Sequence, residues 1–254
     1  MKNIQKKIPI LRLIILILLF SLSGCQVEPP INREIAHVLS ETANSQLTYY
    51  LSPPETGGGI SVEEALMNRR SQRNFQSKEL SEEHLSQILW AAYGITEPMP
   101  DNPPPGGGLR TSPSAGALYP LEIYVAAGNV AGIESGVYKY IPGEHMIVRV
   151  VDRDVREELS AASLSQAMLK DAAITVIYTA VFDRVEARYG QRGRERYVFM
   201  EIGHSAQNIY LQAESLGLGT CAIGAFTDSA LSSLLMLPSD EEPLYLMPVG
   251  HIRE

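Results

Sequence analysis

The sequence predicts an α+β fold in which a mixed sheet is flanked by helices. Segments rich in Val, Ile and Tyr recur at strand length after residue 120, and other segments carry apolar residues at helical spacing. The chain has 254 residues, of which 45% are hydrophobic and 20% are charged. Because these fractions are ordinary for a globular protein, they exclude a collagen-like chain, a wholly disordered chain and a polytopic membrane protein.

The first 24 residues have the layout of an export signal. Four basic residues, from Lys2 to Arg12, come before the apolar run Leu13–Phe20, and no acidic residue lies among them. The apolar run is far shorter than the roughly 20 residues that span a bilayer. The sequence therefore predicts a signal peptide over residues 1–24.

Leu22-Ser23-Gly24-Cys25 resembles the lipoprotein box of bacteria, in which the cysteine becomes the lipidated first residue of the mature protein. Simple secretion and retention as an uncleaved anchor are the alternatives. Because Gln26 rather than Asp follows Cys25, the protein is expected in the outer membrane if the cell envelope has two membranes. A membrane-anchored position outside the cytoplasm is the expected location.

The charge of the chain limits its partners. Removal of residues 1–24 takes away four of the 21 basic residues and none of the 29 acidic ones, so the formal charge changes from −8 to −12. Attachment to a membrane would then rest on acyl chains. The acidic balance also argues against a nucleic-acid partner, because non-specific affinity for nucleic acid comes mainly from clustered Lys and Arg.

Residues 25–60 are predicted to be a tether, because they mix polar residues with four prolines and Gly57–Gly59. The folded domain is predicted over residues 61–254. Ser61 and Ser81 each open a predicted helix, the first with a capping box and the second with a stop at residue 94. Residues 95–112 contain five prolines and are predicted to be a loop.

Strands are predicted in the middle of the chain, and a long helix follows them. The predicted strands are Leu121–Ala127, Gly136–Ile141, His145–Val151, Ala172–Val181 and Leu244–Val249, with Cys221–Phe226 as a short strand or turn. The predicted helices are Asp152–Ala161, about Arg194–Leu216, and Thr227–Leu235. Gly203 lies inside the long helix, where glycine costs about 1 kcal/mol relative to alanine. Close approach of another helix would offset that cost.

The sharpest candidate site is Arg69-Arg70-Ser71-Gln72-Arg73, which places three guanidinium groups and a hydroxyl at a helix end. Arginine offers paired planar donors that suit a phosphate or another polyanion. A solvated basic helix end is the alternative, because basic residues are favoured at helix C-termini. Pro113–Pro120 and Gly217–Phe226 are rich in small residues, which could let the backbone approach a flat ligand or could form plain turns.

The sequence argues against three other kinds of site: a serine nucleophile, a metal site and a catalytic thiol. Gly203-His204-Ser205 looks like a hydrolase nucleophile elbow, but it lies inside a predicted helix, and Gln207 replaces the glycine that the elbow needs. The five histidines show no paired metal-ligand spacing, so no metal site is expected. Cys221 is interpreted as a buried small residue rather than as a catalytic thiol.

Five motifs taken in order resemble the nitroreductase superfamily of flavoproteins, and in particular its branch of azoline dehydrogenases from peptide-heterocycle biosynthesis. These motifs are Arg69–Phe75, Pro113–Pro120, Arg188–Gly193, Gly203–Asn208 and Gly217–Phe226. The resemblance covers roughly residues 60–251. It implies an FMN-binding α+β homodimer with two flavins at the dimer interface, and it favours ligand binding by the arginines over a solvated helix end.

The resemblance also implies roles for single residues. The residues implied to hold the phosphate, ribityl chain and pyrimidine edge of FMN are Arg69, Arg70, Ser71 and Arg73. Those implied to reach the flavin of the partner subunit are Ser114, Ala115 and Gly116. Those implied to pack near the reactive N5 side through backbone groups are Ile223, Gly224 and Ala225.

The sequence departs from the family pattern at two places. Arg253 is a weak replacement for the C-terminal basic group that often contacts the phosphate. Arg188 stands where many azoline dehydrogenases have the Lys of a Lys-Tyr pair, and arginine effectively cannot act as a base. Tyr189 remains the candidate for proton transfer, and azoline oxidation is less favoured.

The resemblance therefore predicts an exported, lipid-anchored, homodimeric FMN oxidoreductase that transfers hydride at flavin N5 by a ping-pong mechanism. Its redox substrate would be a small molecule or a peptide. Because NAD(P)H is largely cytoplasmic, the reductant is expected to be an organic substrate or a membrane redox partner. A catalytically silent flavin-binding or scaffold lipoprotein of the cell envelope is the alternative.

Overall fold

A computed structural model of the chain describes residues 47–99 and 107–253. The predicted signal peptide, the predicted lipidation site Cys25 and most of the predicted tether lie outside the described residues, as does the middle of the predicted loop 95–112. From Gln46 onward the chain forms a single compact unit.

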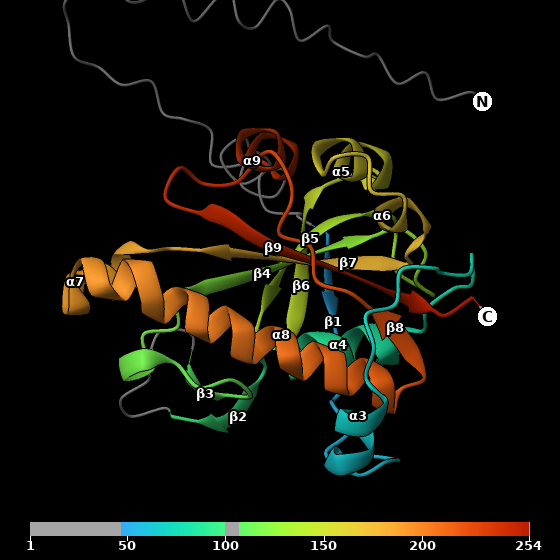
Figure 1. The fold of residues 1–254 in the computed structure, drawn as a ribbon, viewed down its shortest axis with the longest axis horizontal. Helices are drawn as coiled ribbons and strands as arrows, with labels where there is room; N and C mark the ends of the chain where they lie inside the picture. The colour runs from blue at the N-terminus through green and yellow to red at the C-terminus, as the bar shows by residue number, and fades with distance from the viewer. Residues whose placement is uncertain (1–46, 100–106, 254) are drawn as a thin grey trace, which may run out of the picture. The chain divides into compact units, whose positions relative to one another are not determined.

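A seven-stranded sheet in the order β1-β6-β5-β4-β7-β9-β8 forms the centre of this unit (Figure 1). The strands are β1 (Thr48–Tyr50), β4 (Leu121–Ala127), β5 (Gly136–Ile141), β6 (Met146–Val151), β7 (Ile174–Ala180), β8 (Leu218–Thr220) and β9 (Glu242–His251). All neighbouring strands are antiparallel. Within the described residues, parallel pairing is limited to the single bridges Ser71–Thr220 and Leu80–Val130. The α+β class is confirmed, and the mixture of strand directions is limited to those bridges.

Helices cover both faces of the sheet (Figure 1). On one face are α3 (Val62–Asn68), α4 (Glu82–Tyr93) and α8 (Val198–Ser215); on the other are α5 (Arg156–Ala162), α6 (Met168–Asp171) and α9 (Asp228–Leu235). Alternate residues of β4 serve the two layers, because side chains of a strand point to opposite faces. Ile123 and Val125 pack in the core with α4 and α8, whereas Tyr124 and Ala126 pack in the core with α5 and α9.

Several predicted boundaries agree with the structure. β4 and β5 occupy the predicted residues, and the serine caps of α3 and α4 form as expected, with Ser61 Oγ 3.1 Å from Glu64 N and Ser81 Oγ 3.2 Å from His84 N. Each cap satisfies an N–H group that the first helical turn leaves without a partner.

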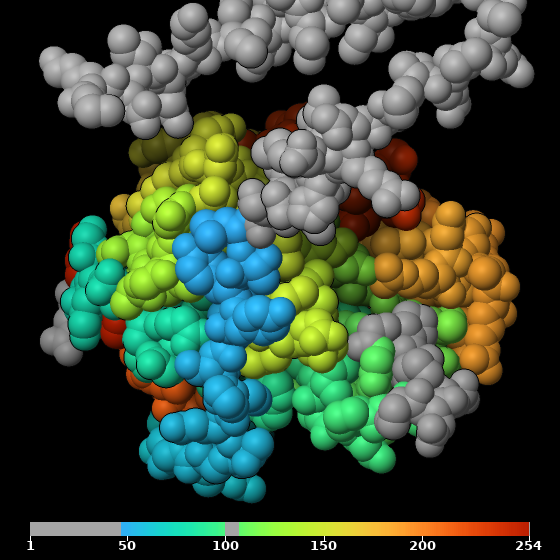
Figure 2. Space-filling model, turned by 180° about the vertical axis from the view of Figure 1, so that it is seen from behind, coloured from blue at the N-terminus to red at the C-terminus, as the bar shows by residue number. Residues whose placement is uncertain are grey.

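The predicted start of the domain at residue 61 is wrong. β1 pairs with β6, and Leu51, which follows it, is only 7% exposed. The Ser52 hydroxyl donates to the carboxylate of Glu82 at 2.5 Å, and Ser52 N donates to the same carboxylate at 2.9 Å. Figure 2 shows this segment in blue, lying against the yellow-green β6 region. The proline and glycine content gave no indication of this short edge strand. Because β1 belongs to the sheet, the domain extends at least from residue 47.

Other differences concern short elements. The predicted loop 95–112 contains the hairpin strands β2 (Ile95–Pro98) and β3 (Gly108–Arg110), and α6 and α7 (Asp183–Tyr189) were not predicted. The long helix is a π-helical turn over Gly193–Tyr197 that continues as α8. Gly203 is exposed, and a Cβ built on it would have no atom within 4 Å, so the expected approach of another helix does not occur among the described residues.

Candidate active site

The arginine-rich segment leaves the end of α3 and lies along β8, the outermost strand of the sheet. Gln72 N donates to Thr220 O at 2.9 Å, and Ser71 forms a parallel bridge with Thr220. These backbone contacts hold the alternate residues Ser71 and Arg73 beside the segment that follows β8. The structure therefore brings two of the predicted motifs, Arg69–Phe75 and Gly217–Phe226, to one edge of the sheet.

Tyr210 of α8 joins these two motifs. Its hydroxyl accepts a hydrogen bond from Ala222 N at 2.8 Å and lies 3.1 Å from Ser71 Oγ, and its ring lies under the Arg69 guanidinium at 5.2 Å. The sequence reasoning missed this residue. The available signal was a tyrosine at a half-buried position of an amphipathic helix, because a tyrosine in such a place usually finds a polar partner for its hydroxyl.

The basic residues of the site differ in their surroundings. Arg70 Nη1 donates to Met67 O at 2.9 Å and to Arg69 O at 2.8 Å, so this side chain caps the end of α3. Arg73 is exposed, and its Nη1 donates to Ser71 O at 3.5 Å. Arg253 N donates to Asn74 O at 3.0 Å, which brings the C-terminal candidate next to the arginine segment.

Gly224 and Ala225 offer backbone donors, but Ile223 does not. Ile223 exchanges both backbone hydrogen bonds with Leu246, at 2.9 and 3.0 Å, and its side chain is 4% exposed. Its N–H and C=O are therefore used in the sheet, and its implied position near N5 stays a prediction. Gly224 and Ala225 are exposed, and no described residue accepts a hydrogen bond from either N–H. A Cβ on Gly224 would approach nothing nearer than the Tyr245 ring at 3.9 Å.

Cys221 lies at the base of this edge. Its side chain is fully buried, and burial raises the pKa of the thiol, although the nearby Arg73 opposes this effect. A thiol with a raised pKa is a weak nucleophile. This agrees with the interpretation of Cys221 as a packing residue.

A second group of predicted site residues surrounds Gly116. Gly116 has φ +64°, and a Cβ built on it would lie 2.7 Å from Tyr189 Oη and 3.0 Å from Arg188 Nη1. Only glycine permits this close approach without displacing the two side chains. The neighbouring Ser114 is half-buried, and its hydroxyl accepts from Tyr119 N at 2.9 Å.

The two groups lie at opposite ends of α8. The group around Gly116 meets the helix at Glu201, whereas the arginine group meets it at Tyr210. Nine helical residues correspond to about 13.5 Å along the axis. In Figure 1, α7 stands at one end of α8, and α3 and β8 stand at the other. One chain therefore does not bring Ser114, Ala115, Gly116 and Tyr189 together with the arginines.

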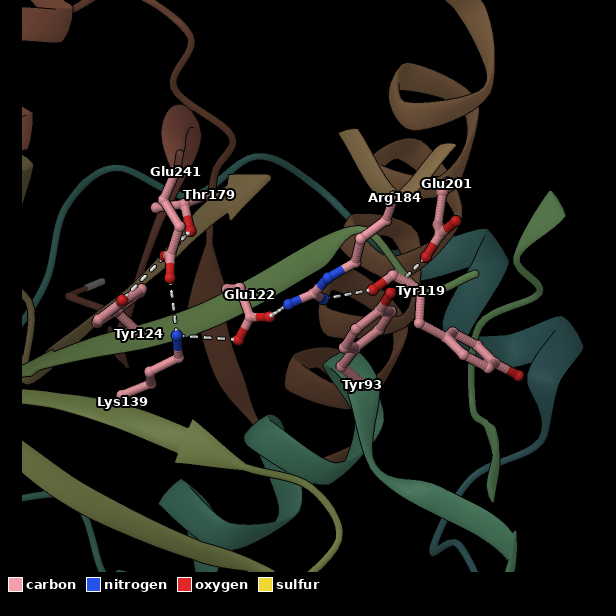
Figure 3. Close-up of polar contacts among 9 residues, drawn as sticks. All are labelled: Tyr93, Tyr119, Glu122, Tyr124, Lys139, Thr179, Arg184, Glu201 and Glu241. Carbon is pink, nitrogen blue, oxygen red and sulfur yellow. Dashed lines mark hydrogen bonds and ion pairs between the residues drawn. The ribbon is translucent and has the colours of Figure 1, made fainter. Parts of the chain in front are cut away.

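Glu201 is a buried carboxyl group behind Ser114 that the sequence reasoning also missed. It is 3% exposed, and it accepts a hydrogen bond from the Tyr93 hydroxyl (Figure 3). Burial raises the pKa of Glu201 to about 7, while the hydroxyls of Ser114 and Tyr93 and the charge of Arg110 act in the opposite direction. A buried acid among hydroxyl groups can hold or release a proton near neutral pH.

A chain of ion pairs supports the same region from the sheet (Figure 3). Arg184 donates to Tyr119 O at 2.9 Å and pairs with Glu122 at 2.5 Å. Lys139 lies 3.1 Å from Glu122 and 2.8 Å from the buried Glu241. Because each buried charge has an opposite partner, this network can hold the end of β4 rigidly without leaving a charge unpaired.

The most prominent cavity of the described chain lies elsewhere. It has a volume of about 670 Å³ and lies between the segment 55–62, Trp90 of α4 and Gln212 of α8. None of the predicted FMN-binding residues lines it. The cavity and the arginine edge are therefore separate features of the described chain.

Two further observations limit the chemistry of the described residues. They include no helix long and apolar enough to cross a membrane. They also contain no group of three or more His, Cys, Asp or Glu side chains placed to hold a metal ion.

The arginine edge has the donors that a phosphate-bearing ligand needs, and comparison with known proteins gives the family. The model of the nitroreductase family matches residues 66–251, so the chain belongs to this family. It is 49% identical over 191 residues to MJ1384 of Methanocaldococcus jannaschii, whose nitroreductase name is provisional; the match covers 75% of this chain and 91% of the relative.

Two other similar proteins extend the comparison. McbC of Escherichia coli, named as a microcin B17-processing protein, is 28% identical over 141 residues, which are 54% of this chain and 52% of McbC. A solved structure from Ralstonia eutropha, provisionally named a nitroreductase, superposes with a TM-score of 0.70 at 26% identity and covers 91% of this chain and 97% of its own. The fold of the chain is that of the nitroreductases.

FMN is the cofactor of this family, and the residues present fit it. Arg69, Ser71 and Arg73 provide charge-assisted donors for a phosphate at one edge. Gly224 and Ala225 provide free peptide N–H groups on an uncrowded surface for a flat ring. The chain is accordingly an FMN-dependent oxidoreductase.

Arginine 73 offers a direct test of the phosphate site. The substitution Arg73→Ala is expected to weaken FMN binding by about 1.5 to 3 kcal/mol, the usual contribution of a charge-assisted hydrogen bond. The matched control is Arg70→Ala, which is expected to change affinity much less, because Arg70 is used to cap α3. Titration of FMN fluorescence would measure both affinities, and equal losses would contradict the assignment.

Proposed function

We propose that the protein is an exported, lipid-anchored FMN oxidoreductase that works as a homodimer with one composite site at each end of the interface. The separation of the two residue groups along α8 carries this proposal. Arg69, Ser71 and Arg73 would bind FMN in one subunit, and Ser114–Gly116 of the other subunit would complete the site. Neither group forms a complete flavin site alone.

Exposed apolar side chains support dimerisation through α3 and α8. Val62 and Met67 on α3 are 63% and 74% exposed, and Phe199 and Met200 on α8 are 50% and 55% exposed. Such a group of large apolar side chains marks an interaction surface. The open space around Gly203 lies on the same helix and would accept a helix of a second copy.

The side chains of the composite site have separate tasks. FMN supplies the acceptance and donation of hydride when it is bound. Arg69 and Arg73 would hold its phosphate and favour the negative charge of its reduced form, and Ser114 would contact it from the partner subunit. Tyr189 lies beside Gly116, where its phenol could donate or accept the proton that accompanies hydride transfer. The half-reactions would alternate in a ping-pong sequence.

The substrate class follows from the site and from the proposed location. The site is open at the sheet edge, which suits a small organic molecule or an exposed part of a peptide. The name of McbC, a peptide-processing protein, supports the peptide as a substrate class. Arg188 in place of lysine disfavours azoline oxidation, because arginine cannot accept a proton at ordinary pH. An organic donor or a membrane redox partner would supply electrons outside the cytoplasm.

The decisive test of function is reconstitution of residues 47–254 with FMN. Flavin absorbance bands are expected to remain after desalting, and reduced protein is expected to be reoxidised by nitroaromatic or quinone acceptors. Turnover with NADH is expected to be slower than with an organic donor. Retained flavin that no acceptor reoxidises would favour the silent flavin-binding scaffold. Loss of the flavin would contradict the proposed oxidoreductase and leave a flavin-free scaffold.

Mixed dimers test the composite site. One subunit would carry Arg73→Ala, and the other would carry Gly116→Leu, whose side chain would collide with Tyr189. If each site takes its two groups from different subunits, the mixed dimer keeps one intact site and binds about one FMN. If each site lies within one subunit, both sites are damaged, so loss of binding would contradict the proposal. Dimers with both substitutions in the same subunit are the matched control. The composite arrangement then leaves no intact site, whereas sites within single subunits leave one intact.

Lipid anchoring depends on Cys25. In the full-length chain, Cys25→Ser is expected to move the protein from the membrane fraction to the soluble extracytoplasmic fraction, because acyl chains can no longer be attached. Fractionation followed by immunoblotting would measure this change. Unchanged membrane association would contradict lipidation and favour an uncleaved anchor.

A further inference from the structure

The ring of Tyr210 has contacts that do not involve its hydroxyl. It packs against the hydrophobic core beside α8, and the Arg69 guanidinium lies 5.2 Å from its centroid. From this fixed ring the hydroxyl reaches the arginine edge, where it lies 2.8 Å from Ala222 N and 3.1 Å from Ser71 Oγ. A phenylalanine at this position would keep the ring contacts, so the role of the hydroxyl can be separated from that of packing.

The directions of these two hydrogen bonds follow from what each group can donate. Ala222 N–H can only donate, so the phenol oxygen accepts from it. Among the described residues, Ser71 Oγ is the one other polar atom within hydrogen-bond distance of this oxygen. The phenol therefore donates its single hydrogen to a lone pair of Ser71 Oγ, because the reverse direction would leave the phenol hydrogen without an acceptor in the described chain. A phenol is also the more acidic hydroxyl and hence the better donor.

Ser71 is left with its own hydrogen free to donate. The residue is exposed, and its hydroxyl has no second hydrogen bond to the described residues. The side chains of Arg69 and Arg73 on either side can only donate, so this edge presents hydrogens and positive charge. The oxygens of an ionised phosphate only accept, and charge-assisted hydrogen bonds to them are strong.

We infer that Tyr210 is a positioning residue that aims the hydroxyl hydrogen of Ser71 at the phosphate of bound FMN. It does so through a relay in which Ala222 N–H donates to the phenol and the phenol donates to the serine. Each hydrogen bond in such a chain polarises the next one, so the intact relay makes the serine a better donor. The inference rests on the FMN site at the arginine edge and does not depend on the composite site of the dimer.

Without the phenol, the hydroxyl of Ser71 is free to rotate. It can then turn a lone pair instead of its hydrogen toward the phosphate, which repels it. A purely structural role of Tyr210 makes a different prediction. If the phenol only held the segment after β8 through Ala222 N, its loss would weaken FMN binding whether or not residue 71 carried a hydroxyl.

A double-mutant cycle of Tyr210→Phe and Ser71→Ala separates these two roles. Tyr210→Phe removes the relay and keeps the ring, and Ser71→Ala removes the last donor of the relay. Ser71→Thr is the conservative variant, because it keeps a hydroxyl. The matched control is Tyr50→Phe, which alters a 76% exposed phenol on β1 at the opposite edge of the sheet.

The affinity of the full-length protein for FMN is measured by fluorescence titration at about pH 8, where the phosphate is ionised. Tyr210→Phe is expected to raise the Kd about threefold to tenfold and Ser71→Ala about tenfold or more, as for a neutral and a charge-assisted hydrogen bond. In the Ser71→Ala background, Tyr210→Phe is expected to raise the Kd by less than about twofold. In the Ser71→Thr background its full effect is expected to return, and Tyr50→Phe is expected to leave the Kd unchanged.

Phosphorus NMR of the flavin bound at saturating FMN gives a second readout. The resonance of the phosphate responds to the hydrogen bonds that it accepts, so Tyr210→Phe and Ser71→Ala are each expected to shift it. Tyr210→Phe is expected to add no further shift once Ser71→Ala is present. A role in holding the segment after β8 would not produce this dependence on the serine hydroxyl.

The outcomes separate this inference from the assignment of FMN. If the unsubstituted protein binds no FMN, the FMN site at the arginine edge fails, and the relay fails with it. If FMN binds but Tyr210→Phe has no effect, or raises the Kd by the same factor with serine or alanine at position 71, only the relay is overturned. A phosphate resonance that Ser71→Ala leaves unchanged would also overturn it, because the serine hydrogen would then not reach the phosphate.

Discussion

The packing of α8 against the central sheet is the constraint on which the rest of the site depends. Ile202, Ala206 and Ile209 are buried in the core with β4, β7 and β9, which fixes the rotation of the helix. With that face buried, Tyr210 is directed to the arginine segment and Glu201 to the Ser114 segment. The pitch of a single helix thus sets the distance between the two halves of the proposed flavin site.

The opposite face of the same helix is exposed and is the proposed contact with a second copy of the chain. Phe199 and Met200 are exposed, and Gly203 presents bare backbone between them and the next turn. A glycine in a helix interior lowers helix stability unless close packing compensates for it. A second copy of the chain would cover these residues and would at the same time join each arginine segment to a Ser114 segment.

The strained Ser114–Tyr119 segment is supported by polar groups rather than by apolar packing alone. Arg184 of α7 donates to Tyr119 O and pairs with Glu122 of β4, which also pairs with Lys139 of β5 (Figure 3). Arg110 of β3 stacks on the Tyr119 ring. Directional hydrogen bonds and ion pairs of this kind restrict a segment to fewer conformations than apolar contacts do. Such rigidity suits the proposed contact of this segment with a cofactor bound by another subunit.

Sequence patterns were sufficient where the information is local. Side-chain periodicity, or residues within a few positions of one another, determine strands β4 and β5, the serine caps of α3 and α4 and the flavin motifs. All of these could be predicted. β1 was missed because three strand residues among prolines and glycines have no periodicity of their own; they form a strand because β6 offers an open edge. The pairing of Ile223 with Leu246 could not be predicted for a related reason, since only the folded sheet brings the two residues together.

The sequence by itself determined the class of the fold, the family and the arginine segment that suits a phosphate. Only the tertiary structure showed that Tyr210 joins two motifs, that Arg70 caps a helix, and that Glu201 lies buried behind Ser114. These facts depend on contacts between residues that are far apart in the chain, such as Tyr93 with Glu201 and Ser71 with Tyr210. Local periodicity indicates which face of a helix is buried, but the polar groups that a buried side chain meets are decided by which elements pack together.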